Sequence, residues 1–330
     1  MIGSAAPHIL VVTTRADVTA DYVVLRLADR GEKCFRLNTE DLPEHSTSSF
    51  GANADSLWWE WESGGLCVDL SEVRAVWYRR HRLPLMNAAL SEGEKDFCLR
   101  ESDWFLRGAL LSRNVRWMSH PSAVTAAEAK LFQLAIAREI GLRVPATLIT
   151  NDPVRARRFV ESNGVAIAKA IRTGYVDDGL SGRAIFSNRI SAADIEGCDE
   201  SIRLSPVIFQ QFIEKTCDVR VTIVDDKLFA ARIDSQGVES ARVDWRRSES
   251  DNLPHSRIDL PPQVAAGCIR LVQRLGLTFG AVDLVIDEKG EWYFLEINPT
   301  GQWAWLEDKL GFDISGSIAD WLSQAIQRTE

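Results

Sequence analysis

The alternation of hydrophobic and polar positions near the start of the chain predicts a strand, a helix and a second strand. Residues 8–13 (HILVVT) are almost continuously apolar, as in a strand that is buried on both faces of a parallel sheet. Apolar residues recur at helical spacing within 17–30, Gly31 ends this helix, and 33–37 predicts the next strand. Such a βαβ unit opens an α/β domain. No GxGxxG motif follows the first strand, so a dinucleotide site is not predicted.

The remaining pattern predicts a mixture of helices and strands. Phe97, Trp104, Phe105 and Leu111 predict an amphipathic helix over 91–112, and a second helix is expected from Ser122 to Ile140. Strands are expected in the segments PATLIT, VAIAKAI, AIFSNRI, VIFQQFI, DVRVTIV, KLFAARI, AVDLVID and EWYFLEIN, a long polar loop at 234–259, and helices near 262–275 and 315–327. The predicted class is α+β with an α/β N-terminal domain. The expected domains are 1–118, 119–206 and 207–330.

The composition narrows the function classes. The 330 residues include 38 Lys and Arg against 47 Asp and Glu, a net charge of −9, which argues against general nucleic-acid binding. A hydrophobic fraction of 45% argues against a disordered chain. The six cysteines form no CxxC pair and suggest reduced thiols, and no apolar run is long enough to span a membrane. We therefore expect a cytoplasmic protein with neither nucleic acid nor membrane as a partner.

Two acidic residues near the C-terminus are predicted to face each other. If Lys289–Gly290 forms a two-residue turn, Asp283 lies opposite Glu296, and Asn298 projects from the same face. Opposed carboxylates repel unless a cation lies between them, and a few hard oxygen ligands suit Mg²⁺. The alternative is an acidic, solvated face. Three hydrophobic residues expected on the same face argue against that alternative: Val285, Trp292 and Phe294.

Several basic residues are predicted to face inward. Lys169 shares its strand face with hydrophobic residues, so it either meets an anion such as phosphate or reaches solvent at a sheet edge. If residues 225–227 form a loop, Arg220 faces Arg232 and the pair shares an anion; otherwise each makes a separate surface salt bridge.

Two further arginines stand in basic clusters. Arg79 ends a predicted strand, where open α/β sheets bind ligands, and Arg246 lies in the long polar loop. The alternative for both arginines is that they belong to solvated clusters on the surface. A tryptophan cluster at 58–61 is predicted to be core, with a peptide-binding or dimer surface as the alternative.

The order of these motifs resembles a known family. Glu128-Ala129-Lys130 is followed by Ala168-Lys169-Ala170, then by FQQFIEKTCDVRVTIV, AARI, GAVDLVID and LEINPTGQWAWLE. This order is similar to that of the ATP-grasp superfamily of carboxylate–amine ligases. The ending, together with Trp77-Tyr78-Arg79-Arg80, resembles the microviridin-type graspetide synthetases, which modify ribosomal peptides. The resemblance covers about residues 118–310 most clearly.

The resemblance implies a three-part fold with ATP between the central and C-terminal domains, and it implies roles for individual residues. Lys130 and Lys169 would hold the nucleotide phosphates, and Glu214 or Asp218 the ribose. Asp283, Glu296 and Asn298 would bind two Mg²⁺ ions, Arg220 and Arg232 would steady the transferred phosphate, and Arg79 and Arg246 would contact an acidic peptide. The adenine pocket would be lined by the hinge residues Gln210, Gln211, Phe212 and Ile213.

The implied activity is a two-step ligation. ATP would activate an Asp or Glu side chain of a precursor peptide as an acyl phosphate, and a hydroxyl or amine of the same peptide would then form a macrocyclic ester or amide. The partner would carry a leader and an acidic core, and 172–183 would form a lid. Oligomeric state stays open, with a homodimer as one alternative. The competing hypotheses are a ligase that uses a free amino acid and a nucleotide-binding regulator without activity.

Overall fold

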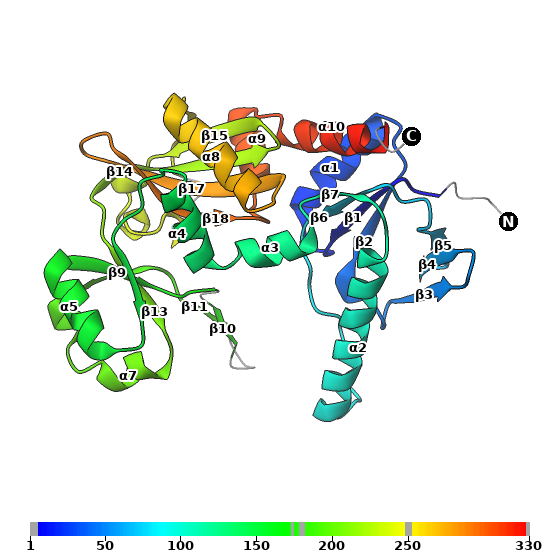
Figure 1. Ribbon diagram of the computed structural model, residues 1–330, viewed down its shortest axis with the longest axis horizontal. Helices are drawn as coiled ribbons and strands as arrows, with labels where there is room; N and C mark the ends of the chain where they lie inside the picture. The colour runs from blue at the N-terminus through cyan, green and yellow to red at the C-terminus, as the bar shows by residue number, and fades with distance from the viewer. Residues whose placement is uncertain (1–5, 173–174, 178–181, 248–252, 328–330) are drawn as a thin grey trace. The chain divides into compact units, whose positions relative to one another are not determined.

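In the computed structural model, the chain forms two compact units (Figure 1). The structure describes residues 6–172, 175–177, 182–247 and 253–327. Unit 1 contains the N-terminal part of the chain as far as Pro121 together with the C-terminal segment from Gln302, and unit 2 is Ser122–Gly301. The domain expected at 207–330 is therefore divided, because its last helices pack with the N-terminal part of the chain rather than with unit 2.

Unit 1 is built on a parallel sheet in the order β2-β1-β6-β7. Its strands are β1 (Ile9–Thr13), β2 (Cys34–Asn38), β6 (Ala75–Tyr78) and β7 (Arg116–Met118). Helix α1 (Val18–Asp29) joins β1 to β2, which confirms the predicted βαβ unit. All five residues of β1 are buried, as expected for a strand covered on both faces. Helices α1 and α10 (Ile314–Gln327) pack together, and both contact β1.

A small antiparallel sheet, β3-β4-β5, contributes to the hydrophobic core of unit 1. Its strands are β3 (Ser46–Ala52), β4 (Leu57–Ser63) and β5 (Leu66–Asp69), and β3 was not predicted. Trp59 and Trp61 are buried in the same cluster as Leu10 and Val12 of β1. The ring of the outward-facing Trp58 lies where a side chain on Gly51 would be. Core packing thus accounts for two of the three clustered tryptophans.

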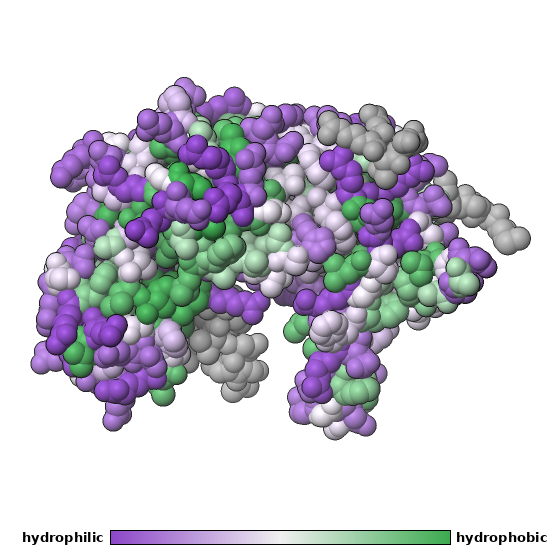
Figure 2. Space-filling view, viewed as in Figure 1, coloured by the Kyte–Doolittle hydropathy of each residue, from purple (hydrophilic) through white to green (hydrophobic). Residues whose placement is uncertain are grey.

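Helix α2 (Glu92–Leu111) forms as predicted, but only some of its predicted apolar positions are buried. A capping box between Ser91 and Glu94 begins it. Its buried residues are Leu106, Ala109 and Leu110, which join the core together with the half-buried Phe105, whereas Phe97, Trp104 and Leu111 are exposed. Figure 2 accordingly shows hydrophobic patches among polar ones on this helix. Only the C-terminal half of α2 packs against the sheet, so periodicity along its full length was misleading.

Unit 2 contains two larger sheets. The first is antiparallel, in the order β12-β9-β13-β8, and packs with α5 (Pro153–Asn163), α6 (Ala192–Ile195) and α7 (Asp199–Leu204). Its strands are β8 (Thr147–Thr150), β9 (Val165–Lys169), β12 (Asn188–Ser191) and β13 (Val207–Gln211). Asp152 caps α5 and Pro153 begins it.

The second sheet of unit 2 has the order β16-β15-β14-β17-β18. Its strands are β14 (Lys215–Val224), β15 (Lys227–Ile233), β16 (His255–Arg257), β17 (Phe279–Asp287) and β18 (Trp292–Asn298). Helix α8 (Pro262–Arg274) covers β14 and β17, and α4 (Lys130–Glu139) contacts both α8 and the edge strand β18. The long polar loop is in part ordered, because β16 and three short 3₁₀ turns lie within it: Ser235–Gly237, Glu239–Ala241 and Trp245–Arg247.

The prediction of a single helix from Ser122 to Ile140 is wrong, because the structure has two helices there. These are α3 (Pro121–Ala127) and α4, and they are separated at Glu128 and Ala129. The break places Lys130 at the first turn of α4 instead of inside a continuous helix. A further short helix, α9 (Ala304–Leu310), precedes α10.

The predicted lid at 172–183 lies largely outside the described residues. Two short antiparallel strands are described there, β10 (Tyr175–Asp177) and β11 (Gly182–Ala184). None of the helices in the described parts of the chain is both long enough and apolar enough to cross a membrane.

Candidate functional site

The hairpin of β17 and β18 brings two carboxylates together. Asp283 pairs directly with Glu296, which confirms the predicted juxtaposition. The loop differs from the predicted two-residue turn, because Asp287 N–H already donates to the Glu291 carbonyl across it. A β-bulge between the Asp283 and Leu284 pairs compensates for this difference and restores the predicted register at the carboxylates.

The same bulge reverses part of the predicted face assignment. Trp292 and Phe294 pair with residues of the opposite face and do not lie beside the carboxylates, as had been expected. Leu295, expected in the core, instead lines the cavity described next. An extra residue in one strand shifts the alternation by one position, and a pattern of period two cannot reveal where that shift occurs.

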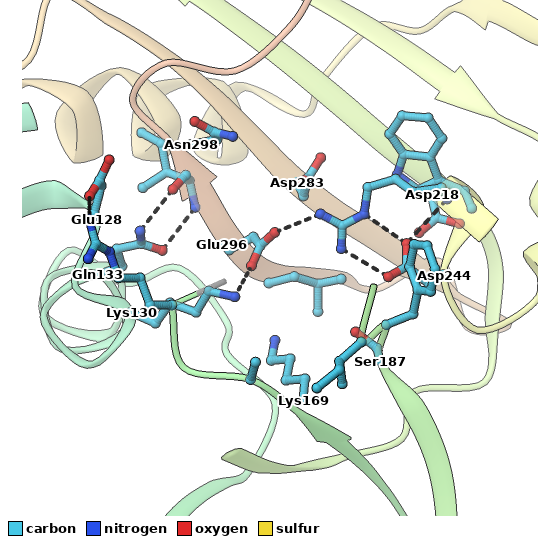
Figure 3. Close-up of a pocket in the computed structure, with 18 of the residues that line it drawn as sticks. Glu128, Lys130, Gln133, Lys169, Ser187, Asp218, Asp244, Asp283, Glu296 and Asn298 are labelled. Atoms are coloured by element: carbon cyan, nitrogen blue, oxygen red, sulfur yellow. Dashed lines mark hydrogen bonds and ion pairs between the residues drawn. The ribbon is translucent and has the colours of Figure 1, made fainter. Parts of the chain in front are cut away.

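A cavity of about 470 Å³ opens beside these carboxylates within unit 2 (Figure 3). Its polar lining comes from both sheets, from α4 and from the 3₁₀ segment that ends at Arg247. The charged and amide side chains that line it include Lys130, Gln133, Lys169, Asp218, Asp244, Arg246, Asp283, Glu296 and Asn298. The structure thus places seven sequence-predicted residues, from positions 130 to 298, around one space.

Three cations surround Glu296. Lys130 Nζ lies 2.9 Å from Glu296 Oε2, and Arg246 Nη1 lies 3.3 Å from Oε1. Burial alone would raise the pKa of the Glu296 carboxyl, but Lys130, Lys169 and Arg246 together lower it to about 2. Glu296 is therefore ionised at neutral pH. The repulsion expected between the two opposed carboxylates is offset here by protein cations.

Asp244 fixes the orientation of Arg246. Its two oxygens accept hydrogen bonds from Arg246 Nε at 2.8 Å and Nη2 at 3.0 Å. Burial favours the neutral acid, but the hydrogen bonds from Arg246 outweigh it and lower the pKa of Asp244. The guanidinium is therefore fixed by two charge-assisted hydrogen bonds and directed at Glu296.

Gln133 is a site residue that the sequence did not indicate. Its buried amide donates to the Ile297 carbonyl at 2.8 Å and accepts from the Ile297 N–H at 3.1 Å. It thereby provides hydrogen-bond partners for the backbone of the edge strand β18 between Glu296 and Asn298. Because Gln133 lies one helical turn after Lys130, this contact also holds the lysine beside Glu296. The indication of this role in the sequence was the spacing of three residues between Lys130 and Gln133, which places both on one side of a helix.

Lys169 enters the cavity from β9, as its inward-facing position predicted. Burial lowers the pKa of its ammonium to about 8, although the nearby Glu296 carboxylate opposes this effect. Its Nζ donates to Gln210 Oε1 at 3.0 Å.

Arg220 lies beside Asp283, and the predicted pairing of Arg220 with Arg232 is wrong. Arg220 Nη1 is 2.8 Å from Asp283 Oδ1. A two-residue turn between β14 and β15 places Arg220 opposite Ala231, so that Arg232 points from the other face and ion-pairs with Asp234. A side chain at Gly301 would meet Arg220 Nη2 at 2.5 Å, so only glycine leaves room for this guanidinium.

A smaller cavity of about 60 Å³ adjoins the first one and contains the predicted hinge. All four hinge residues, Gln210, Gln211, Phe212 and Ile213, line it, together with apolar residues such as Ile167 and Val285. A small cavity of mixed polar and apolar lining, next to a space that contains Lys130, Lys169 and Arg246, matches the two ends of a nucleotide.

The two candidate ribose ligands differ in their environment. Asp218 is buried and accepts from Lys215 Nζ at 2.7 Å and from Ser235 Oγ at 2.6 Å, whereas Glu214 is exposed at the end of the hinge. Burial, only partly offset by Lys215, raises the pKa of Asp218. Arg79 belongs to neither cavity: it is 1% exposed inside unit 1, with Nε 3.5 Å from Asp17 Oδ2.

The donor set fits Mg²⁺ better than a structural metal. Asp283, Glu296 and Asn298 supply only hard oxygens, and within the described ranges no cluster of three or more His, Cys, Asp or Glu side chains is arranged for a metal. Two carboxylates and an amide leave several coordination positions for water and phosphate, which is the usual way in which proteins bind Mg²⁺.

Comparison with known families agrees with this geometry. Residues 8–125 match the MvdD pre-ATP grasp domain, and residues 126–322 match the RimK-like ATP-grasp domain. The second match covers more than half of the chain. The protein is therefore an ATP-grasp ligase, as the order of motifs suggested.

Comparison with solved structures shows which kind of ATP-grasp ligase the protein is similar to. Macrocyclase MdnB from Microcystis aeruginosa is 31% identical, with a TM-score of 0.79 over 95% of this chain and 98% of that one. A Chryseobacterium gregarium RiPP-associated ATP-grasp ligase, solved with ADP and a leader and core peptide, is 27% identical, with a TM-score of 0.90 over 96% and 97%. The chain belongs to the graspetide-type ATP-grasp maturases.

Curated relatives match a smaller part of the chain. A probable alpha-L-glutamate ligase of Xanthomonas campestris is 25% identical over 55% of this chain and 68% of its own length. A protein of the same name from Desulfotalea psychrophila is 22% identical over 62% and 43%.

Proposed function

We propose that this ligase uses ATP to crosslink side chains of a ribosomal precursor peptide. The observation that carries the proposal is the similarity over 96% of the chain to a ligase solved with ADP and a leader and core peptide. The glutamate-ligase matches cover only 55% and 62% of the chain. The substrate would have a leader and an acidic core, and the products would be side-chain esters or amides.

The cavity residues support a phosphate-transfer step. Lys130, Lys169 and Arg246 all lie around Glu296, so this part of the cavity offers three cations to an anionic ligand. In the proposed complex the two lysines contact the phosphates of ATP, and Asp283, Glu296 and Asn298 hold Mg²⁺. Mg²⁺, when bound, neutralises part of the charge on the phosphate oxygens. Arg220 is close enough to this space to hold the substrate carboxylate that receives the phosphoryl group.

The second step follows from the chemistry of the acyl phosphate. A hydroxyl or amine of the same peptide attacks the acyl carbon, phosphate leaves, and one water is lost from the peptide for each bond. Because an acyl phosphate hydrolyses in water, the cavity must exclude water during this step. Ile185 and Phe186 give one side of the cavity an apolar lining.

The proposal is tested with a synthetic acidic peptide from a precursor encoded near the gene, incubated with the protein, ATP and Mg²⁺. We expect peptide-stimulated ADP release and a product that is lighter by one water per crosslink, measured by mass spectrometry. A peptide with Asn and Gln in place of its acidic residues is the matched control and should release no additional ADP.

A ligase acting on free amino acids is the second candidate, because the curated relatives are named as glutamate ligases. If free glutamate stimulates ADP release while no peptide does so, this candidate replaces the first.

A further inference from the structure

The strand register of the first sheet of unit 2 aligns three polar side chains on one face. Gln210 of β13 lies opposite Thr147 of β8 on one side and opposite Ile167 of β9 on the other. Lys169 is two residues beyond Ile167 and therefore projects from the same face. The register alone places Gln210 between a threonine hydroxyl and the ammonium of Lys169.

The direction of each hydrogen bond in this row is determined. Thr147 Oγ1 donates its single proton to the Pro145 carbonyl at 2.9 Å. It can therefore only accept from Gln210, whose Nε2 lies 2.9 Å away. The amide nitrogen of Gln210 consequently faces Thr147, and its oxygen, Oε1, must face Lys169 Nζ at 3.0 Å. Hydrogen-bond chemistry thus excludes the flipped amide.

The partner of Lys169 is neutral, and this distinguishes the two lysines of the cavity. Lys130 is paired with a carboxylate, that of Glu296, whereas Lys169 is hydrogen-bonded to an amide oxygen. An amide oxygen orients the ammonium without neutralising its charge. It occupies one of the three N–H donors, and the other two stay available for a phosphate. Gln210 is only 3% exposed, so water does not compete for the contact.

We propose that Gln210 is a positioning residue that holds the Lys169 ammonium for the nucleotide phosphates, and that Thr147 fixes Gln210 in turn. This rests on the proposed function, in which Lys169 contacts those phosphates. It adds to the sequence interpretation, which placed Gln210 in the lining of the adenine pocket. The role predicts a larger effect on the phosphate end of the nucleotide than on the base.

The experiment compares the binding of ADP and of adenosine, by calorimetry, to the full-length protein and its variants. Gln210→Met removes the amide at similar length, and we expect roughly tenfold weaker ADP binding, as for one charge-assisted hydrogen bond. Thr147→Val, outside both cavities, should weaken ADP binding by about threefold because it leaves the amide unanchored. Thr147→Val should leave adenosine binding unchanged, and Gln210→Met, which alters the lining of the smaller cavity, should weaken adenosine binding less than ADP binding.

The control is Thr150→Val on the same strand. Thr150 Oγ1 accepts from the Asp152 N–H and takes no part in the row that leads to Lys169. We expect unchanged ADP binding from this variant. Equal effects of Thr147→Val and Thr150→Val would overturn the proposal, as would a Gln210→Met variant that loses adenosine affinity as strongly as ADP affinity.

A double-mutant cycle with Lys169→Ala separates this proposal from the function on which it rests. If Gln210 acts through Lys169, Gln210→Met has no further effect in the Lys169→Ala protein. If Lys169→Ala weakens ADP binding but Gln210→Met still weakens it fully in that background, only the role of Gln210 fails. If Lys169→Ala leaves ADP binding unchanged, the phosphate role of Lys169 fails and this proposal fails with it.

Discussion

At the scale of single residues, three cations of the cavity gather around the buried carboxylate of Glu296, while other carboxylates complete the lining: Asp218, Asp244 and Asp283. The pKa of Glu296 falls to about 2 because Lys130, Lys169 and Arg246 surround it. In the protein without ligand, this carboxylate balances the cations. When ATP binds, its phosphates would take over the contacts with these cations, and a metal ion would take over the contact with Glu296. Glu296 can therefore act both in the free protein and in the complex.

Glu296→Gln removes that charge with little change of shape. We expect peptide-stimulated ADP production to fall by roughly a hundredfold, since even indirect partners of a metal typically contribute 10–100-fold. A coupled ADP assay measures the effect. Glu291→Gln is the control on the same hairpin, because Glu291 pairs with Arg143 at the surface. Activity that survives in Glu296→Gln would show that the metal assignment is incorrect.

The pKa of Lys169, about 8, predicts a pH dependence of nucleotide binding. A bound phosphate favours the charged ammonium, and above pH 8 the free protein has lost that proton. Metal-free ADP affinity should therefore fall as pH rises from 8 to 9, by at most about tenfold per unit. The charged groups that influence Lys169 are Glu296, Lys130, Arg246 and Asp244. Titration calorimetry at several pH values measures the slope.

Lys169→Arg is the control for the pH dependence, because an arginine keeps its charge throughout this range. The variant should bind ADP with little dependence on pH between 8 and 9. An equal slope in both proteins would assign the titration to another group.

At the scale of elements, the segment of residues 243–247, which contains the 3₁₀ turn Trp245–Arg247, joins the two sheets of unit 2. Lys215 of β14 donates to the Val243 carbonyl at 3.2 Å and holds the beginning of this segment. At its end, Arg247 donates to the Ser187 carbonyl at 2.7 Å and to Asn188 Oδ1 at 2.6 Å, next to β12. Its guanidinium also lies over the Phe186 ring. The segment thus forms a wall of the cavity and carries Arg246.

Arg247→Met should loosen this wall without removing a group that touches the nucleotide. We expect the KM for ATP to rise by about threefold to tenfold, with a smaller change in kcat, because the loss concerns uniform binding. Steady-state kinetics measure both constants. Arg242→Met is the matched control in the preceding turn, where an exposed ion pair with Glu239 contributes little. A large fall in kcat with an unchanged KM would contradict the role.

At the scale of the whole molecule, unit 2 is a continuous segment between two parts of unit 1. The C-terminal helix α10 completes unit 1, and its residues Ile314, Ile318 and Leu322 are fully buried. The stability of unit 1 therefore depends on residues at both ends of the chain.

Leu322→Ala tests this dependence. We expect the free energy of unfolding of unit 1 to fall by about 2–5 kcal/mol, the usual range for a buried leucine. Tryptophan fluorescence in denaturant reports mainly on unit 1, because Trp245 and Trp292 alone of the 11 tryptophans belong to unit 2. ADP binding should be retained. Gln324→Ala, on the exposed side of α10, should leave stability unchanged.

The sequence by itself determined the local structure and the chemical character of the site. Patterns of period two and 3.6 predicted the βαβ unit, α8 and α10, and the spacing on one hairpin brought Asp283 and Glu296 together. These inferences depend only on residues that are close in sequence, where backbone geometry leaves few alternatives. The family was accessible for the same reason, since its motifs are short and their order is retained along the chain.

The tertiary structure decided which distant residues meet. A bulge moved Leu295 into the cavity, a tighter turn separated Arg232 from Arg220, and packing at one end of α2 chose its buried face. Gln133 and the row from Thr147 to Lys169 depend on contacts between separate elements. Such outcomes follow from strand register and from packing over long sequence separations, which no local pattern of hydrophobic and polar residues encodes.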